Sequence, residues 1–63
     1  MMEGVSARLL VIEDDDHVRL MLRMMLEDEG YQVSEAGTAE GGLIRFETDR
    51  PDMVLVDLKL PDR

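Results

Sequence analysis

Residues 51–57 read PDMVLVD, an apolar run that starts after a proline and stops at a carboxylate. The run is rich in β-branched side chains and too short for a helix, so it predicts a strand, Met53–Val56, suited to burial on both faces. Residues 8–14, RLLVIED, show the same pattern, because an apolar run again ends in acidic side chains. The two runs therefore predict strands of a parallel sheet, each followed by acids.

A helix is predicted over His17–Glu29, where apolar residues recur at helical spacing. Asp15 or Asp16 is expected as its N-cap, and Gly30 is expected to end it as a C-cap. The periodicity places four side chains on its inner face: Val18, Met21, Leu22 and Met25.

A second strand and a second helix are predicted farther along the chain. Residues 31–36, YQVSEA, alternate in polarity, which is typical of a half-solvated edge strand. Thr38 is expected as the N-cap of a helix over residues 39–49, which Pro51 ends. This helix is expected to be the weaker one, because each of its two glycines costs about 1 kcal/mol relative to alanine.

The order strand, helix, strand, helix, strand predicts an α/β fold with a parallel sheet and right-handed crossovers. Helices on one face would give the strand order 1-2-3, and helices on opposite faces would give 2-1-3. Since the first and third strands are apolar throughout and the second alternates, we expect 2-1-3. Ligands bind such sheets beyond the carboxyl ends of the strands, where the strand order reverses.

Three carboxylates, those of Glu13, Asp14 and Asp57, are expected to meet at that point. Such a cluster takes up a proton or a cation, and a hard divalent ion such as Mg²⁺ suits it. With its charge neutralised, Asp57 could attack phosphorus and form an acyl phosphate. The plainer alternative is an acid cluster that only suits a helix dipole, together with an ordinary acid at a strand end.

The motifs LLVIEDD, EDEGY, EA and RPDMVLVDLKLPD, in this order and separation, resemble the receiver domain of bacterial two-component response regulators. The resemblance covers nearly everything from Arg8 onward. It implies that residues 8–63 are the N-terminal half of a flavodoxin-like receiver domain with βαβαβ connectivity. Residues 1–7 are expected to form a flexible tail.

The resemblance also implies roles for individual residues. Asp57 matches the phosphoacceptor, and Glu13 and Asp14 match the acidic pair that holds Mg²⁺ together with Asp57. The main-chain carbonyl of Lys59 matches a further metal ligand, and Pro61 matches the proline of the following loop. The implied phosphate donor is a sensor histidine kinase, and the implied module is not a classical enzyme.

The chain departs from the family in length, because a complete receiver domain has a later part that supplies a Ser or Thr and a Lys to the phosphoryl group. An alternative therefore stays open: a phosphotransfer-deficient binding or assembly module that forms a homodimer through its unpaired third strand. A metal-dependent hydrolase is disfavoured, since no base or second metal cluster is visible. Phosphatases with an Asp-x-Asp motif would need an acid at position 59, which is Lys59.

Composition restricts the partners. The net charge of −8, from 15 acidic and 7 basic residues, disfavours direct binding of nucleic acid. With no cysteine and no long apolar run, we expect a cytoplasmic protein that does not enter a membrane. By resemblance only, His17, Leu20 and Met24 are candidate kinase contacts; the two apolar ones alternatively pack under a neighbouring loop.

Overall fold

The structure is a computed structural model that describes residues 6–57. Each predicted element is present, and the bounds differ from the expected ones by at most one residue. The elements in chain order are β1 (Arg8–Ile12), α1 (Asp16–Asp28), β2 (Gln32–Ala36), α2 (Ala39–Asp49) and β3 (Met53–Val56).

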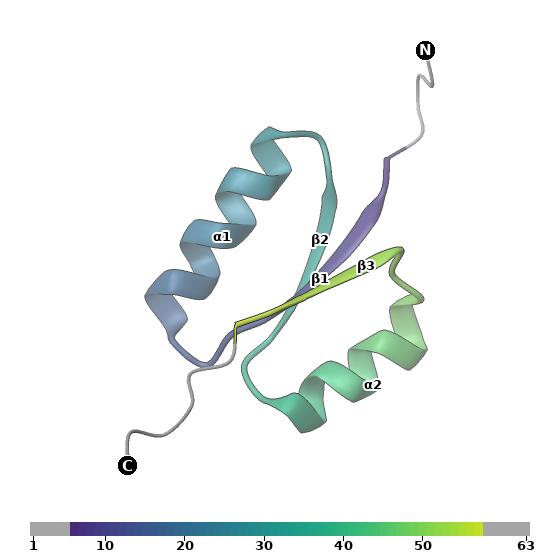
Figure 1. Cartoon of the computed structure of the whole chain (residues 1–63). Coiled ribbons are helices and arrows are strands. Elements are labelled where there is room, and N and C mark those ends of the chain that lie inside the picture. Colours follow the sequence, from purple (N-terminus) through teal and green to yellow (C-terminus); the bar gives the residue numbers. More distant parts are fainter. Residues whose placement is uncertain (1–5, 58–63) are drawn as a thin grey trace.

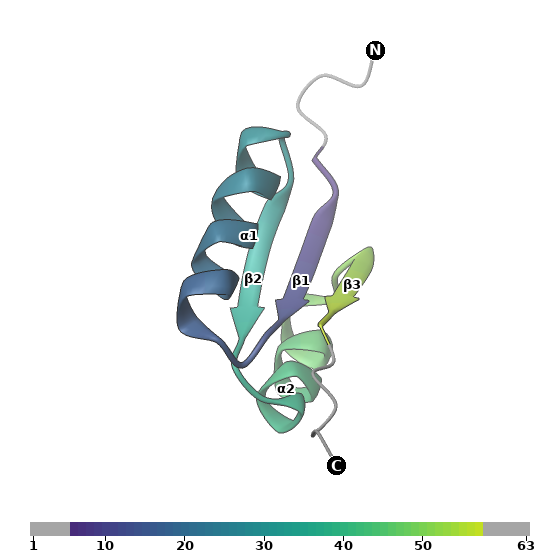
Figure 2. The same cartoon turned by 60° about the vertical axis from the view of Figure 1, so that its left-hand side comes forward.

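The three strands form one parallel sheet in the order β2-β1-β3. The two helices cover opposite faces of this sheet, α1 on one side and α2 on the other (Figure 1). Seen from the side, β1 runs between its two neighbours (Figure 2). The predicted α/β fold and the order 2-1-3 are therefore confirmed.

The core is centred on β1, because this strand has a neighbour on each side and a helix over each face. Leu10 and Val11 are fully buried, and Leu9 and Ala36 are nearly so. Full burial of an aliphatic side chain contributes about 1.5–3 kcal/mol, so β1 supplies much of the hydrophobic stabilisation of this small fold.

Both helices begin at the caps that the sequence indicates. The Asp15 carboxylate accepts the N–H groups of His17 at 2.9 Å and Val18 at 3.1 Å. The Thr38 hydroxyl accepts the N–H of Gly41 at 2.9 Å. At the end of α1 the cap itself is Glu29, and Gly30 follows it at a φ of 103°, a value that favours glycine.

The inner face of α1 differs from the prediction. Met21 and Met25, which the periodicity placed inside, are 53% and 57% exposed. Arg19 and Arg23 instead lie partly covered and pair with Glu35 of β2. Among the described elements α1 packs on β1 and β2, and Glu35 of β2 offers the two arginines a partner there.

β3 is an edge strand, and it is uncovered. Its four residues are 40 to 48% exposed, and among the described elements its only neighbour is β1. The start of the strand is held by Asp52, whose carboxylate accepts the N–H of Arg8 at 2.8 Å. The apolar side chains that predict burial on both faces therefore form an exposed apolar margin of the sheet.

Two further expectations concern the ends of the chain and membranes. Most of the predicted tail over residues 1–7 lies outside the described residues. Neither helix found within residues 6–57 has the length and apolar character needed to span a bilayer.

Candidate functional site: an acidic pocket at the carboxyl end of the sheet

The strand ladders extend one residue past β1 and β3, and this fixes two acids at the same end of the sheet. The N–H of Glu13 donates to the carbonyl of Ala36 at 3.0 Å. The N–H of Asp57 donates to the carbonyl of Ile12 at 3.0 Å. Both acids are therefore held by main-chain hydrogen bonds and not by flexible loop contacts.

A pocket of about 200 Å³ lies at this end of the sheet, and all three predicted acids line it. Its other walls come from the ends of β1 and β3 and from the loop that leads into α2. The lining residues are Ile12, Glu13, Asp14, Gly37, Thr38, Ala39, Val56 and Asp57.

The three acids have different surroundings. Glu13 is 1% exposed, and its Oε2 accepts the N–H of Asp15 at 2.8 Å. Asp14 and Asp57 are exposed. Burial of a carboxylate is costly unless hydrogen bonds compensate for the lost water, so the Glu13 contact also shapes the loop that carries Asp14. The exposed pair is accessible to a ligand from solvent.

The carboxylates suit a hard cation, since Mg²⁺ takes one or two carboxylates and keeps several waters. Within residues 6–57 no three acidic or histidine side chains lie close enough together to hold a metal ion. A site built on the exposed pair needs only two of them. Lys59 and Pro61, predicted beside this site, lie outside the described residues.

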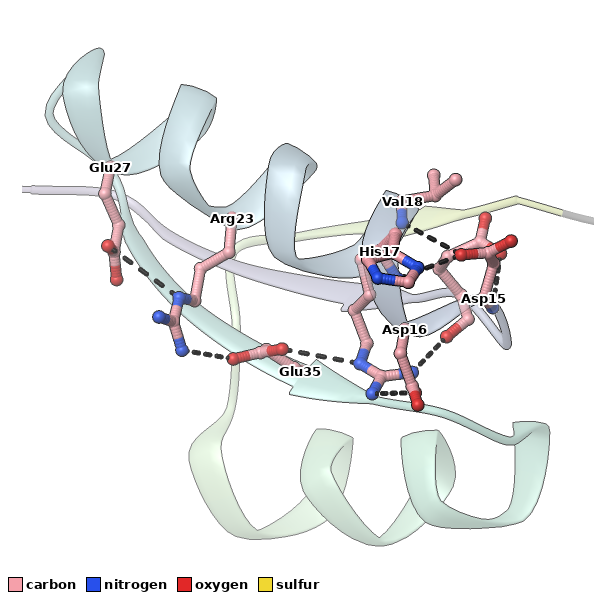
Figure 3. A network of polar contacts seen from close by, with 9 residues as sticks. Asp15, Asp16, His17, Val18, Arg23, Glu27 and Glu35 are labelled. Carbon is pink, nitrogen blue, oxygen red and sulfur yellow. Dashed lines mark hydrogen bonds and ion pairs between the residues drawn. The ribbon is translucent and has the colours of Figure 1, made fainter.

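The sequence did not lead us to predict that a positive side chain, Arg19, lies beside the pocket. Arg19 donates to the main-chain oxygen of Glu13 at 2.7 Å and to Asp16 at 2.6 Å, and it pairs with Glu35 at 3.4 Å. Arg23 bridges Glu35 and Glu27 farther along α1 (Figure 3). The available signal was the alternation of β2, which turns Glu35 toward α1.

The hydrogen bond to Asp16, assisted by the charges of Asp16 and Glu35, raises the pKa of Arg19 above its usual value despite some desolvation. Because this group is protonated at every physiological pH, it is a permanent positive charge next to the acidic pocket.

Comparison with known proteins identifies the family. The model of the response regulator receiver domain matches residues 9–63. The chain belongs to the response regulator receiver family. Its βαβαβ order and acidic strand ends agree with that assignment, and the resemblance seen in the sequence is confirmed.

Several curated bacterial regulators resemble this receiver chain. The KDP operon transcriptional regulatory protein KdpE of Escherichia coli is 43% identical over 54 residues, which are 86% of this chain. The transcriptional regulatory protein AfsQ1 of Streptomyces coelicolor is 42% identical over 53 residues, or 84% of the chain. PdtaR of Mycobacterium tuberculosis, also a transcriptional regulatory protein, is 40% identical over 61 residues, or 95% of the chain.

The receiver chain corresponds to only part of each relative. The matched region is 24% of KdpE, 24% of AfsQ1 and 30% of PdtaR. By their names these relatives are transcriptional regulatory proteins, and the segment that this chain shares with them is a receiver module of two-component response regulators.

Proposed function

We propose that this receiver module accepts a phosphoryl group on Asp57 from a phosphohistidine of a sensor histidine kinase in the cytoplasm. The observation that most directly supports this role is that Asp57, exposed at the end of β3, lines one pocket with Asp14 and Glu13. In this role the module is a phosphorylated switch and not a classical enzyme, and it makes no direct contact with nucleic acid.

In this reaction Asp57 is the nucleophile, and the neighbouring oxygen ligands hold the metal ion. A carboxylate oxygen of Asp57 attacks phosphorus while the donor nitrogen leaves, which forms an acyl phosphate. Asp14 and Asp57 would hold Mg²⁺ together with the main-chain carbonyl of Lys59, and the buried Glu13 would hold the loop that carries Asp14. When bound, this ion supplies positive charge to the phosphoryl oxygens and to the crowded carboxylates.

Intact-mass analysis after incubation of the 63-residue chain with acetyl phosphate and Mg²⁺ tests the proposal. We expect one added phosphoryl group that is absent in Asp57→Asn. Asp52→Asn is the matched control, because Asp52 is an exposed aspartate at the opposite end of the same strand. An adduct that persists in Asp57→Asn would contradict the assignment. An adduct only in a longer receiver chain would assign the chemistry to the complete domain.

The exposed surface of α1 supports the proposed docking of the kinase. His17, Leu20 and Met24 are exposed, so the alternative that the two apolar residues pack under a loop finds no support within residues 6–57. Exposed apolar side chains on a helix are suited to packing against a partner helix.

A second candidate function is assembly, and the uncovered β3 favours it. Beside β3 lies an apolar groove of about 530 Å³, lined by residues of β1, β3 and α2, among them Leu10, Phe46 and Val54. A free strand edge next to an apolar groove is suited to pairing with another chain. We propose that a second copy pairs there and forms a homodimer.

Sedimentation equilibrium tests the dimer with two lysine variants of equal charge change. Val54→Lys alters the groove and is expected to give monomers. Ile44→Lys alters an apolar residue that is 64% exposed on α2 and does not line the groove, so it should leave the dimer intact. A monomeric wild-type chain would contradict this candidate without bearing on Asp57.

A further inference from the structure

Arg19 bridges the two loops that form the walls of the acidic pocket. Its side chain is 20% exposed, and its Nη1 donates to the Glu13 carbonyl at 2.7 Å, at the start of the loop between β1 and α1. The same nitrogen lies over Gly37 in the loop between β2 and α2. A Cβ added at Gly37 would lie 3.0 Å from it, so the missing side chain leaves room for the guanidinium.

The contact with the Glu13 carbonyl acts directly on Asp14. The carbonyl of Glu13 and the N–H of Asp14 belong to one planar peptide group, so a hydrogen bond that orients the oxygen also orients the start of Asp14. Asp16 pairs with Nη2 at 2.6 Å and Glu35 with Nε at 3.4 Å. These contacts hold the guanidinium while its Nη1 donates to the Glu13 carbonyl.

We propose that Arg19 is a positioning residue that holds Asp14 in place against the Gly37 loop and thereby sets the metal affinity of the acidic pocket. This inference rests on the proposed function, since it presumes that a divalent cation binds there. Arg19 acts through the main chain of Glu13 and touches neither the cation nor the phosphoryl group.

The direction in which metal affinity changes when Arg19 is replaced distinguishes a positioning role from a purely electrostatic one. Removal of a positive charge near a cation site would tighten cation binding by Coulomb's law alone. Loss of a group that orients a metal ligand instead weakens binding, by about 10–100-fold where such partners hold the ligand itself. Since Arg19 holds the main chain beside the ligand, we expect the lower end of this range, about tenfold.

Mn²⁺ binding to the 63-residue chain, measured by loss of the free-ion signal in electron paramagnetic resonance, provides the first test. Arg19→Met should weaken Mn²⁺ affinity about tenfold. Arg23→Met is the matched control, because Arg23 pairs with the same Glu35, at 2.6 Å, while Glu35 and Glu27 do not line the pocket. Its affinity should stay at the wild-type value.

Two further variants address charge and geometry separately. Arg19→Lys keeps the charge but offers one nitrogen in place of a planar fork, so its affinity should fall toward that of Arg19→Met. Gly37→Ala keeps Arg19 but displaces its flexible end, so it should weaken binding with little loss of stability. Unchanged or tighter Mn²⁺ binding in Arg19→Met would overturn the proposal, as would full affinity in Arg19→Lys.

Amide hydrogen exchange needs no metal, so it distinguishes a failure of this inference from a failure of the proposed function. The N–H of Asp15 donates to Glu13 Oε2 within the loop that Arg19 holds, and the N–H of Glu13 donates to the Ala36 carbonyl at the start of that loop. In Arg19→Met their hydrogen exchange should become about tenfold faster, while in Arg23→Met it should not. A wild-type chain that binds no Mn²⁺ contradicts the proposed metal site, and exchange alone then decides whether Arg19 positions the loop. Unchanged exchange in Arg19→Met would overturn the inference.

Discussion

Gly42 decides how closely α2 approaches β1. A Cβ at this position would clash with Cδ1 of Ile12 and would lie 2.8 Å from its Cγ1, far inside van der Waals contact. In an isolated helix alanine would be better than glycine by about 1 kcal/mol. The contact with Ile12 therefore explains why a glycine inside α2 is tolerated here.

Gly42→Ala tests that balance. Overpacking costs about 1–3 kcal/mol, which exceeds the gain in helix propensity, so we expect a net loss of about 1 kcal/mol in the free energy of unfolding. Ile12→Val removes the nearest methyl group but keeps Cγ1, so in that background Gly42→Ala should cost less than in the wild-type chain. Urea unfolding of the four proteins measures the coupling. Equal losses in both backgrounds would show that Ile12 is not the cause.

One carboxylate of β2 contributes to the attachment of α1 to the sheet. Glu35 accepts Arg23 at 2.6 Å and pairs with Arg19 at 3.4 Å, and all three side chains are partly covered. Pairs that retain some solvent contact are worth less than buried ones, because water screens them. The network nevertheless joins residues that are twelve or more positions apart in the chain, so it orients the helix on the strand.

Replacement of Glu35 by glutamine should lower the free energy of unfolding by about 1 kcal/mol, a value discounted for partial exposure. The loss should shrink at high salt, where ionic screening already weakens the wild-type pairs. Asp28→Asn is the control, since removal of an acid from the last turn of a helix slightly favours the helix dipole. Thermal unfolding at low and high NaCl measures both. A loss that does not change with salt would assign Glu35 a packing role.

Much of this fold follows from local patterns in the sequence. The apolar run of β1, the alternation of β2 and the caps at Asp15 and Thr38 agree with the structure, and the strand order is as predicted. The apolar run of β3 predicts the strand but not the exposure of its side chains. The common end of the strands also brings the predicted acids to one pocket.

The inner face of α1 and the role of Arg19 could not be predicted in the same way. Helical periodicity ranks side chains by hydrophobicity, so it places Met21 and Met25 inside. It does not register that Glu35 offers arginines a partner on the neighbouring strand. The contact between Arg19 and Gly37 joins two loops, and no periodic pattern connects such segments.

Across the whole molecule, negative charge exceeds positive charge by eight, and part of the excess is gathered around one pocket. Repulsion among like charges disfavours the compact state. A cation bound to the pocket would relieve part of this repulsion and, because it binds only the folded state, would stabilise it by mass action.

An increase of NaCl from about 10 mM to about 150 mM should raise the urea midpoint, because the Debye length falls from about 30 Å to about 8 Å. MgCl₂ at the same ionic strength should raise the midpoint further, and Asp14→Asn should remove only this extra gain. Far-UV circular dichroism measures the transition. Equal midpoints in the two salts would argue against a specific cation site.

Among the elements of residues 6–57, β3 is attached only to β1, and this has a consequence for the order of folding. The hydrogen-bonded partners of these two strands are more than forty positions apart in the chain, so their pairing closes the longest loop in the sheet. Closure of such a long loop is slow, because its cost in conformational entropy is offset only when β3 finds β1 already formed. The segment from β1 to α2 is thus expected to form first, as a nucleus, and β3 to join last and detach first.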